Sequence, residues 1–134
     1  CMRHIKSKYY MVCYGDTFAD INLDNLIKKF QKKTNKIFMT CYEMKTNFGI
    51  VEIKNNSTIV NFKEKPKLNL WFNIGYFLFN SNEIRNLKNY KSFRDFITKS
   101  SKNKKFILHK HSGKHITINT ISELEKARRD INIS

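Results

Sequence analysis

The chain has 134 residues, of which 40% are hydrophobic, which fits one domain with a modest core and argues against disorder. No apolar run reaches the length of a membrane span, and the first residues lack the apolar segment of a secretory signal. We therefore expect a soluble, cytoplasmic protein with no membrane partner. The net charge of +15 makes nucleic acid the first partner to consider.

The distribution of this charge argues against nucleic acid. Most of it is lysine scattered among asparagines, while base and phosphate recognition favours arginine. Arginine occurs only at Arg3, Arg85, Arg94, Arg128 and Arg129. No zinc-finger, helix-turn-helix or RNA-recognition signature is present, and the lysine clusters at 28–33 and 102–105 are typical of solvated faces. A lysine-rich module that binds nucleic acid or another polyanion is kept as the alternative function.

The first predicted element is a strand from Tyr9 to Tyr14, a short apolar run closed by Gly15-Asp16. Its composition predicts burial on both faces and therefore a parallel sheet. Asp16 would lie just past the carboxyl end of this strand, where open α/β sheets place their ligands and where a carboxylate can hold a magnesium ion. An ordinary Gly-Asp turn is the alternative.

A helix and a second strand follow. Asn22 can cap a helix whose apolar stripe is spaced i, i+3, i+4, i+7, at Leu23, Leu26, Ile27 and Phe30. Residues 36–42 return as a strand. Strand, helix and strand together predict a βαβ unit.

Residues 48–53 and 58–62 predict an antiparallel hairpin around an Asn-Asn turn, with Ile59 and its apolar neighbours facing a core. Gly49 marks either a close approach of backbone to a ligand or a bulge. The single proline, Pro66, ends the second strand, so Glu64 and Lys65 project from the strand end. A carboxylate beside an ammonium suits a polar, phosphorylated ligand, and a solvated turn is the alternative.

The most apolar run, residues 70–79, predicts a central strand, and it contains two residues that are out of character. Asn73 needs hydrogen-bond partners if it is buried, and Gly75 weakens a strand unless something packs against its backbone. Both are easier to explain at the wall of a ligand site.

The rest of the chain predicts short helices at 81–87 and 92–100, strands at 105–111 and 115–118 around a Ser-Gly turn, and a final helix that begins with a capping box of Thr120 and Glu123. His109, His111 and His115 would share a hairpin, but no fourth ligand is evident and histidines on an edge strand need no metal. The three cysteines match neither a disulfide framework nor a metal pattern.

The order of these signals is more specific than any one of them. Tyr14-Gly15-Asp16 with Asp20-Ile21-Asn22, Phe48-Gly49-Ile50-Val51, Phe62-Lys63-Glu64-Lys65-Pro66, Asn73-Ile74-Gly75 and Asn119-Thr120 follow one another along the chain. This series resembles the sugar nucleotidyltransferases, and within them the glucose-1-phosphate cytidylyltransferase-like branch. The family joins a sugar 1-phosphate to a nucleoside triphosphate, releases pyrophosphate, and supplies nucleotide sugars for polysaccharide biosynthesis.

The resemblance implies a Rossmann-like α/β/α fold with a mixed sheet, Mg²⁺ as cofactor, and roles for individual residues. Asp16 would be a catalytic magnesium ligand, and Lys65 would neutralise the phosphate of the sugar 1-phosphate. Glu64 and Asn73 would bond sugar hydroxyls. Gly49 and Gly75 would let the sugar approach the backbone.

Two departures from the family pattern limit this assignment. Members begin with a strand and a glycine-rich basic loop that holds the triphosphate, and nothing of the kind precedes Tyr9. We therefore expect residues 1–134 to be the carboxy-terminal portion of one nucleotidyltransferase domain, inactive alone or associated with a chain or segment that carries the other half. Secondly, Asn119 stands where many members have a metal-binding aspartate, and it would offer a carbonyl oxygen without charge.

Overall fold

The computed structural model describes residues 6–55 and 57–131. In chain order its elements are β1 (Tyr9–Cys13), β2 (Thr17–Ala19), α1 (Leu23–Gln31), β3 (Ile37–Lys45), β4 (Ile50–Lys54), β5 (Thr58–Lys63), β6 (Lys67–Asn80), α2 (Ser81–Asn86), the 3-10 turn η1 (Leu87–Asn89), α3 (Phe93–Lys102), β7 (Phe106–His111), β8 (His115–Thr117) and α4 (Ile121–Ile131). Within the described ranges, no helix combines the length and apolarity needed to cross a bilayer.

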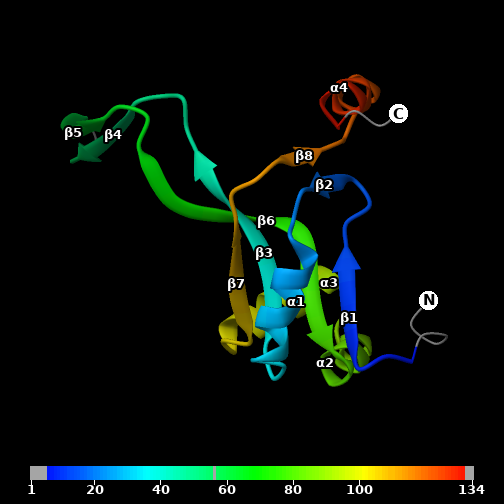
Figure 1. Cartoon of the computed structure of the whole chain (residues 1–134). Helices are drawn as coiled ribbons and strands as arrows, with labels where there is room; N and C mark the ends of the chain where they lie inside the picture. Colours follow the sequence, from blue (N-terminus) through cyan, green and yellow to red (C-terminus); the bar gives the residue numbers. More distant parts are fainter. Residues whose placement is uncertain (1–5, 56, 132–134) are drawn as a thin grey trace.

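The main sheet is mixed and has the strand order β1-β6-β3-β7 (Figure 1). Strand β6 runs antiparallel to both of its neighbours, and β3 and β7 are parallel. The predicted central strand is confirmed, although β6 starts at Lys67 rather than Leu70. The expectation of a parallel pairing for the first strand is wrong, because β6 lies between β1 and β3 and leaves β1 at an edge, half-buried.

Helices cover both faces of this sheet and give the predicted three layers. On one face, Leu26 and Phe30 of α1 pack against Phe38 and Leu78. On the other face, Phe77 and Phe79 pack against α2 and α3, where Phe96 is fully buried. Adjacent residues of β6 thus point into opposite cores, as the alternation of a strand requires. Each buried phenylalanine contributes about 1.5–3 kcal/mol to folding.

The predicted cap of α1 is confirmed, since the Asn22 side chain accepts a hydrogen bond from the Asn25 N–H at 2.9 Å. Leu26 and Phe30 are buried, but Leu23 at the start of the stripe is 44% exposed. The first turn of the helix therefore extends past the edge of the core.

The β4–β5 hairpin forms with the predicted antiparallel pairing, but every residue of its two strands is exposed. Ile59 is 61% exposed, so its predicted place in a core is wrong. The hairpin projects beyond the layer that the helices cover (Figure 1). Its ladder irregularity lies between Glu52 and Ile53, so the bulge interpretation of Gly49 is also wrong.

Strands β7 and β8 form where predicted but do not pair with each other. Strand β7 extends the main sheet beside β3, while β8 pairs with β2 in a separate two-stranded sheet. The Tyr76 hydroxyl donates to the Thr17 carbonyl at 3.2 Å and joins β2 to the main sheet. The predicted hairpin of residues 105–118 is therefore a crossing from one sheet to another.

The capping box of α4 is confirmed. The Glu123 N–H donates to the Thr120 hydroxyl at 3.2 Å, and Glu123 Oε2 accepts from the Thr120 N–H at 3.0 Å. Ala127 is the buried residue of this helix.

Candidate functional site

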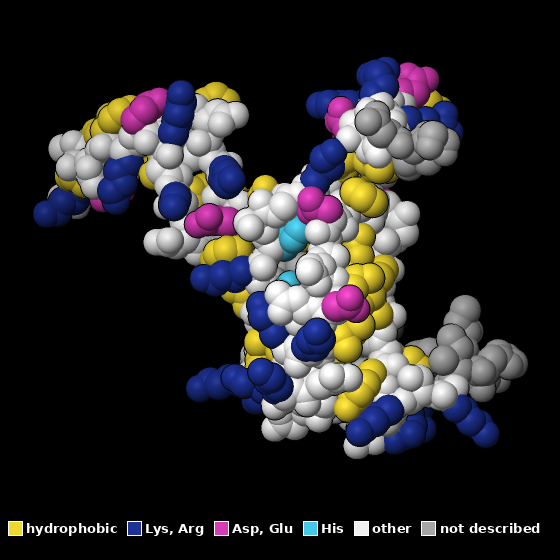
Figure 2. Space-filling view, in the orientation of Figure 1, with side chains coloured by type: hydrophobic (Ala, Val, Ile, Leu, Met, Phe, Trp, Pro, Cys, Tyr) yellow, Lys and Arg dark blue, Asp and Glu magenta, His cyan; other side chains and the backbone are white. Residues whose placement is uncertain are grey.

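The candidate residues lie around one end of the main sheet, where β1, β3 and β7 have their carboxyl ends (Figure 1). The space-filling view shows a deep notch above this end, with the β4–β5 hairpin on one side and α4 on the other (Figure 2). Ligands of open α/β sheets bind at carboxyl ends of strands. We take the floor and walls of this notch as the candidate site.

Asp16 lies in the turn between β1 and β2. Its carboxylate is exposed, and Oδ1 accepts a hydrogen bond from the Thr17 hydroxyl at 3.2 Å. Its backbone carbonyl accepts from the Ile118 N–H at 2.8 Å, which brings the segment after β8 beside it. The fold therefore places Asp16 next in space to the residue that precedes Asn119.

Asn119 begins the turn into α4, and its backbone N–H donates to Glu123 Oε2 at 2.6 Å. This hydrogen bond is the main reason that the pKa of the Glu123 carboxyl lies below its usual value. Glu123 caps the helix, and a hydrogen bond with the exposed Asn119 side chain also contributes to its lowered pKa.

Asn73 and Gly75 form a hydrogen-bonded corner with Tyr14, a residue that the sequence analysis did not single out. The Asn73 side chain donates to the Tyr14 hydroxyl at 3.2 Å and accepts from the Gly75 N–H at 2.8 Å. The Tyr14 N–H donates to the Gly75 carbonyl at 2.9 Å. The partly buried Asn73 amide thus has a partner on each side, the Tyr14 hydroxyl just after β1 and the Gly75 N–H.

Gly49, Glu64 and Lys65 lie at the base of the hairpin, where it meets β6. A Cβ on Gly49 would stand 2.4 Å from the Phe62 ring and 3.1 Å from Glu64 Oε2. A larger residue at position 49 would therefore crowd the exposed Phe62 and Glu64 side chains, and a sugar contact there stays a prediction. Glu64 and Lys65 are both exposed as predicted, and Lys65 has a positive φ of 44°.

An aromatic cluster, also absent from the predicted set, joins residues of β3, β6 and β8. The Tyr42, Phe72 and His115 rings contact one another at centroid distances of 5.5–5.8 Å. Burial, and then the charge of His111, hold the pKa of His115 below its usual value, so the ring is neutral near pH 7.

His111 links β7 to the segment before α1. Its Nε2 lies 3.0 Å from the Lys114 carbonyl and 3.1 Å from Asp20 Oδ1. Because a carbonyl only accepts, Nε2 carries the proton and donates. The described part of the chain contains no cluster of three His, Cys, Asp or Glu side chains suited to a metal.

The arrangement provides three kinds of group around one notch. Asp16 and Asn119 offer oxygen atoms on the floor, Asn73 and Tyr14 offer hydrogen-bonding groups, and Lys65 offers a cation at the hairpin base. Such a set can position an anionic, hydroxyl-rich ligand and neutralise its charge, but it contains no pair arranged as nucleophile and base.

Comparison with known proteins gives one family match and a fold. The family model described as nucleotidyl transferase matches residues 2–116. No curated protein matches the sequence significantly. Among solved structures, one from Bacillus anthracis, described as a glucose-1-phosphate thymidylyltransferase in complex with sucrose, superimposes with a TM-score of 0.68 at 18% identity. HddC from Yersinia pseudotuberculosis superimposes with a TM-score of 0.61 at 16% identity.

These two alignments cover 100% and 97% of the chain, but in each case only 58% of the solved structure. The chain therefore spans little more than half the length of these structural neighbours. At such low identity, the likeness establishes the fold alone.

Proposed function

The chain belongs to the nucleotidyl transferase family, and from this premise we propose that it forms the sugar-phosphate half of the site of an enzyme that joins a sugar 1-phosphate to a nucleoside triphosphate. The observation that carries the proposal is a pair of hydrogen bonds, one between Asn73 and Tyr14, two residues before Asp16, and one between Ile118, just before Asn119, and the Asp16 carbonyl. The description of the Bacillus anthracis neighbour as a sugar-phosphate thymidylyltransferase supports it.

The proposed reaction is the attack of a sugar-phosphate oxygen on the α-phosphorus of the triphosphate. The new oxygen–phosphorus bond forms as the bond from the α-phosphorus to pyrophosphate breaks. The attacking oxygen carries negative charge at neutral pH, so no base is needed to remove a proton. The protein has to hold two anions together in line, and this requires positioning and charge neutralisation.

In this proposal Lys65 approaches the phosphate of the sugar 1-phosphate as a compact cation. Asn73 and Glu64 bond sugar hydroxyls. The Asn73 amide is held by Tyr14 and by the Gly75 N–H, so its orientation is fixed before the sugar arrives. A preorganised amide loses little freedom on binding.

The oxygen atoms on the floor fit a magnesium ion. Asp16 supplies an exposed carboxylate and Asn119 an amide carbonyl, and both are hard oxygen donors. Their segments are joined by the backbone hydrogen bond from the Ile118 N–H to the Asp16 carbonyl. Two protein ligands are typical for Mg²⁺, which keeps several waters and takes phosphate oxygens as further ligands. When bound, the ion would neutralise the negative charge of the phosphates.

Isothermal titration calorimetry with glucose 1-phosphate tests the proposal, and Lys65→Gln is the informative variant. We expect it to weaken binding by about tenfold, since a charge-assisted contact contributes about 1.5 kcal/mol or more. Lys54→Gln, at the far end of the same hairpin, is the matched control and should leave the affinity unchanged. Equal effects from both variants, or no binding of any sugar 1-phosphate to the unmodified chain, would contradict the proposed role.

A further inference from the structure

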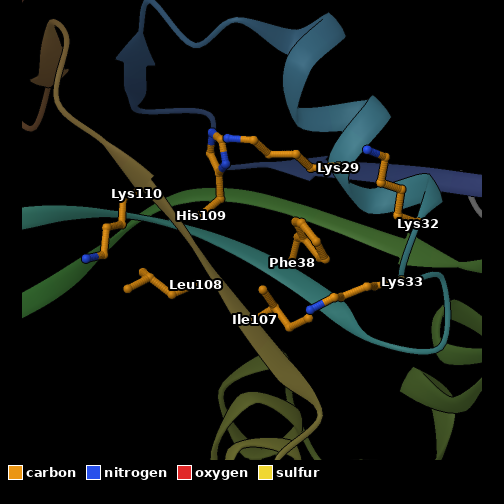
Figure 3. A pocket seen from close by; sticks show the side chains of 8 residues that line it. All are labelled: Lys29, Lys32, Lys33, Phe38, Ile107, Leu108, His109 and Lys110. Carbon is orange, nitrogen blue, oxygen red and sulfur yellow. The ribbon is translucent and has the colours of Figure 1, made fainter.

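A second concave site lies on the side of the molecule where α1 meets the edge strand β7 (Figure 3). The groove has a volume of about 440 Å³. Its floor is apolar and includes Phe38 and Ile107, and its rim carries Lys29, Lys32 and Lys33 together with His109. None of these residues belongs to the candidate site in the notch.

The rim is positive and its charge is not neutralised. No acidic side chain lines the groove. Within residues 6–55 and 57–131, no ion pair involves Lys29, Lys32 or Lys33. Lys110 also borders the groove, but its ammonium lies 5.0 Å from the Trp71 ring centroid and is thereby directed elsewhere.

The dipole of α1 can stabilise only part of the positive charge that these lysines place at the end of the helix. The carboxyl end of a helix carries the equivalent of about half a negative charge, which favours one nearby cation. The combined charge of the three lysines is larger than this, and the three ammonium groups repel one another. Burial, and then the charge of Lys29, keep the pKa of His109 below its usual value, so the imidazole adds hydrogen-bonding atoms without further charge near pH 7.

We propose that this groove binds a small phosphorylated organic anion of the nucleoside polyphosphate class, at a site separate from the one in the notch. The volume lies within the range of small-molecule sites. The apolar floor suits a flat ring, and the lysines suit phosphate oxygens. Nucleic acid fits less well, because the charge is gathered in one hollow that holds about one nucleotide rather than spread along a track.

Nuclear magnetic resonance with ¹⁵N-labelled chain tests this site. The probes are ATP, inorganic tripolyphosphate and adenosine, each in EDTA to exclude magnesium. We expect ATP to shift the amides of Ile107 to His109 most strongly, tripolyphosphate to bind at the same place at least about fivefold more weakly, and adenosine to bind only feebly, because both the ring and the charge contribute.

The double variant Lys29→Gln, Lys33→Gln should weaken ATP binding by at least about tenfold. The matched control, Lys88→Gln with Lys102→Gln, removes the same charge from the last turns of other helices and should not change it. Lys65→Gln should also leave it unchanged, so loss of the sugar-phosphate site and loss of this groove give different results.

Three outcomes would overturn the proposal. The first is an ATP-induced shift pattern centred on the notch. The second is equal weakening by the two lysine pairs, which would indicate non-specific attraction to a basic surface. The third is tighter binding of single-stranded RNA than of ATP at the same lysines, which would make the groove part of a nucleic-acid surface.

Discussion

Gly75 combines a positive φ with close packing against an aromatic ring. Its φ is +82°, and a Cβ there would lie 2.5 Å from the Tyr14 ring. Gly75→Ala should therefore lower the free energy of unfolding by about 1–3 kcal/mol, because an L side chain is strained at this φ and the ring must move. Urea denaturation measures this change.

Gly15→Ala is the matched control, because a Cβ at Gly15 meets no atom within 4 Å. We expect little change in stability for this variant. If the two variants lost equal stability, the corner of Tyr14, Asn73 and Gly75 would not be a packed unit.

The histidines predict a pH dependence of stability. The pKa values of His109 and His115 are both lowered, chiefly by burial, so the unfolded chain binds protons that the folded chain does not. This contribution to stability is fully present above the ordinary histidine pKa near 6.5, and it is lost as the pH falls from there through the lower pKa values of the folded chain. Urea midpoints at pH 7.5 and 5.5 should show this loss, and His115→Phe should reduce it. A midpoint that rose on acidification would contradict the argument.

For individual residues, the sequence correctly predicted interactions between residues that are close together in the chain. The Asn22 cap and the box of Thr120 and Glu123 are set within four residues, and both are confirmed. Tyr14 was missed as a partner of Asn73, because that hydrogen bond joins residues 59 positions apart and depends on how β1 pairs. The roles of Asp16, Lys65 and Asn119 stay predictions, because the structure fixes their places and not their ligands.

Among the elements, the β4–β5 hairpin is the one least stabilised by burial. All of its strand residues are exposed, and its ion pair of Lys63 and Glu52 is on the surface, where such pairs contribute little. Its amides should exchange with deuterium at least about a hundredfold faster than those of β6 between Ile74 and Phe79. Mass spectrometry of peptic fragments measures both segments in one experiment. Equal protection would show that something covers the hairpin in solution.

The hairpin also shows where pattern reading fails. The alternation in Thr58–Lys63 predicted a strand correctly, but it cannot say whether the apolar side of that strand meets a core. Likewise, β7 and β8 were predicted as neighbours because one tight turn separates them. The fold instead uses that turn to pass from one sheet to another, a choice decided by β2, nearly a hundred residues earlier.

For the whole molecule, the three-layer architecture and the mixed sheet were predicted through the family resemblance, and the strand order was not. The apolar run of β6 identifies a central strand. Its position between β1 and β3 depends on pairing between strands that are distant in the chain, which the local pattern does not specify. The high positive charge, first read as solvated surface, is in part gathered at the groove beside β7.

An amide-shift titration of the ¹⁵N-labelled chain with glucose 1-phosphate and Mg²⁺ tests the sugar-phosphate site most directly. We expect the sugar phosphate to shift the amides of Gly49, Glu64 and Lys65 and those of the Asn73–Gly75 corner. The amide of Asp16 should respond to the ion. We also expect little change at Lys29 to Lys33. Shifts confined to the groove beside β7, or none at all, would contradict the assignment of the notch as a sugar-phosphate site.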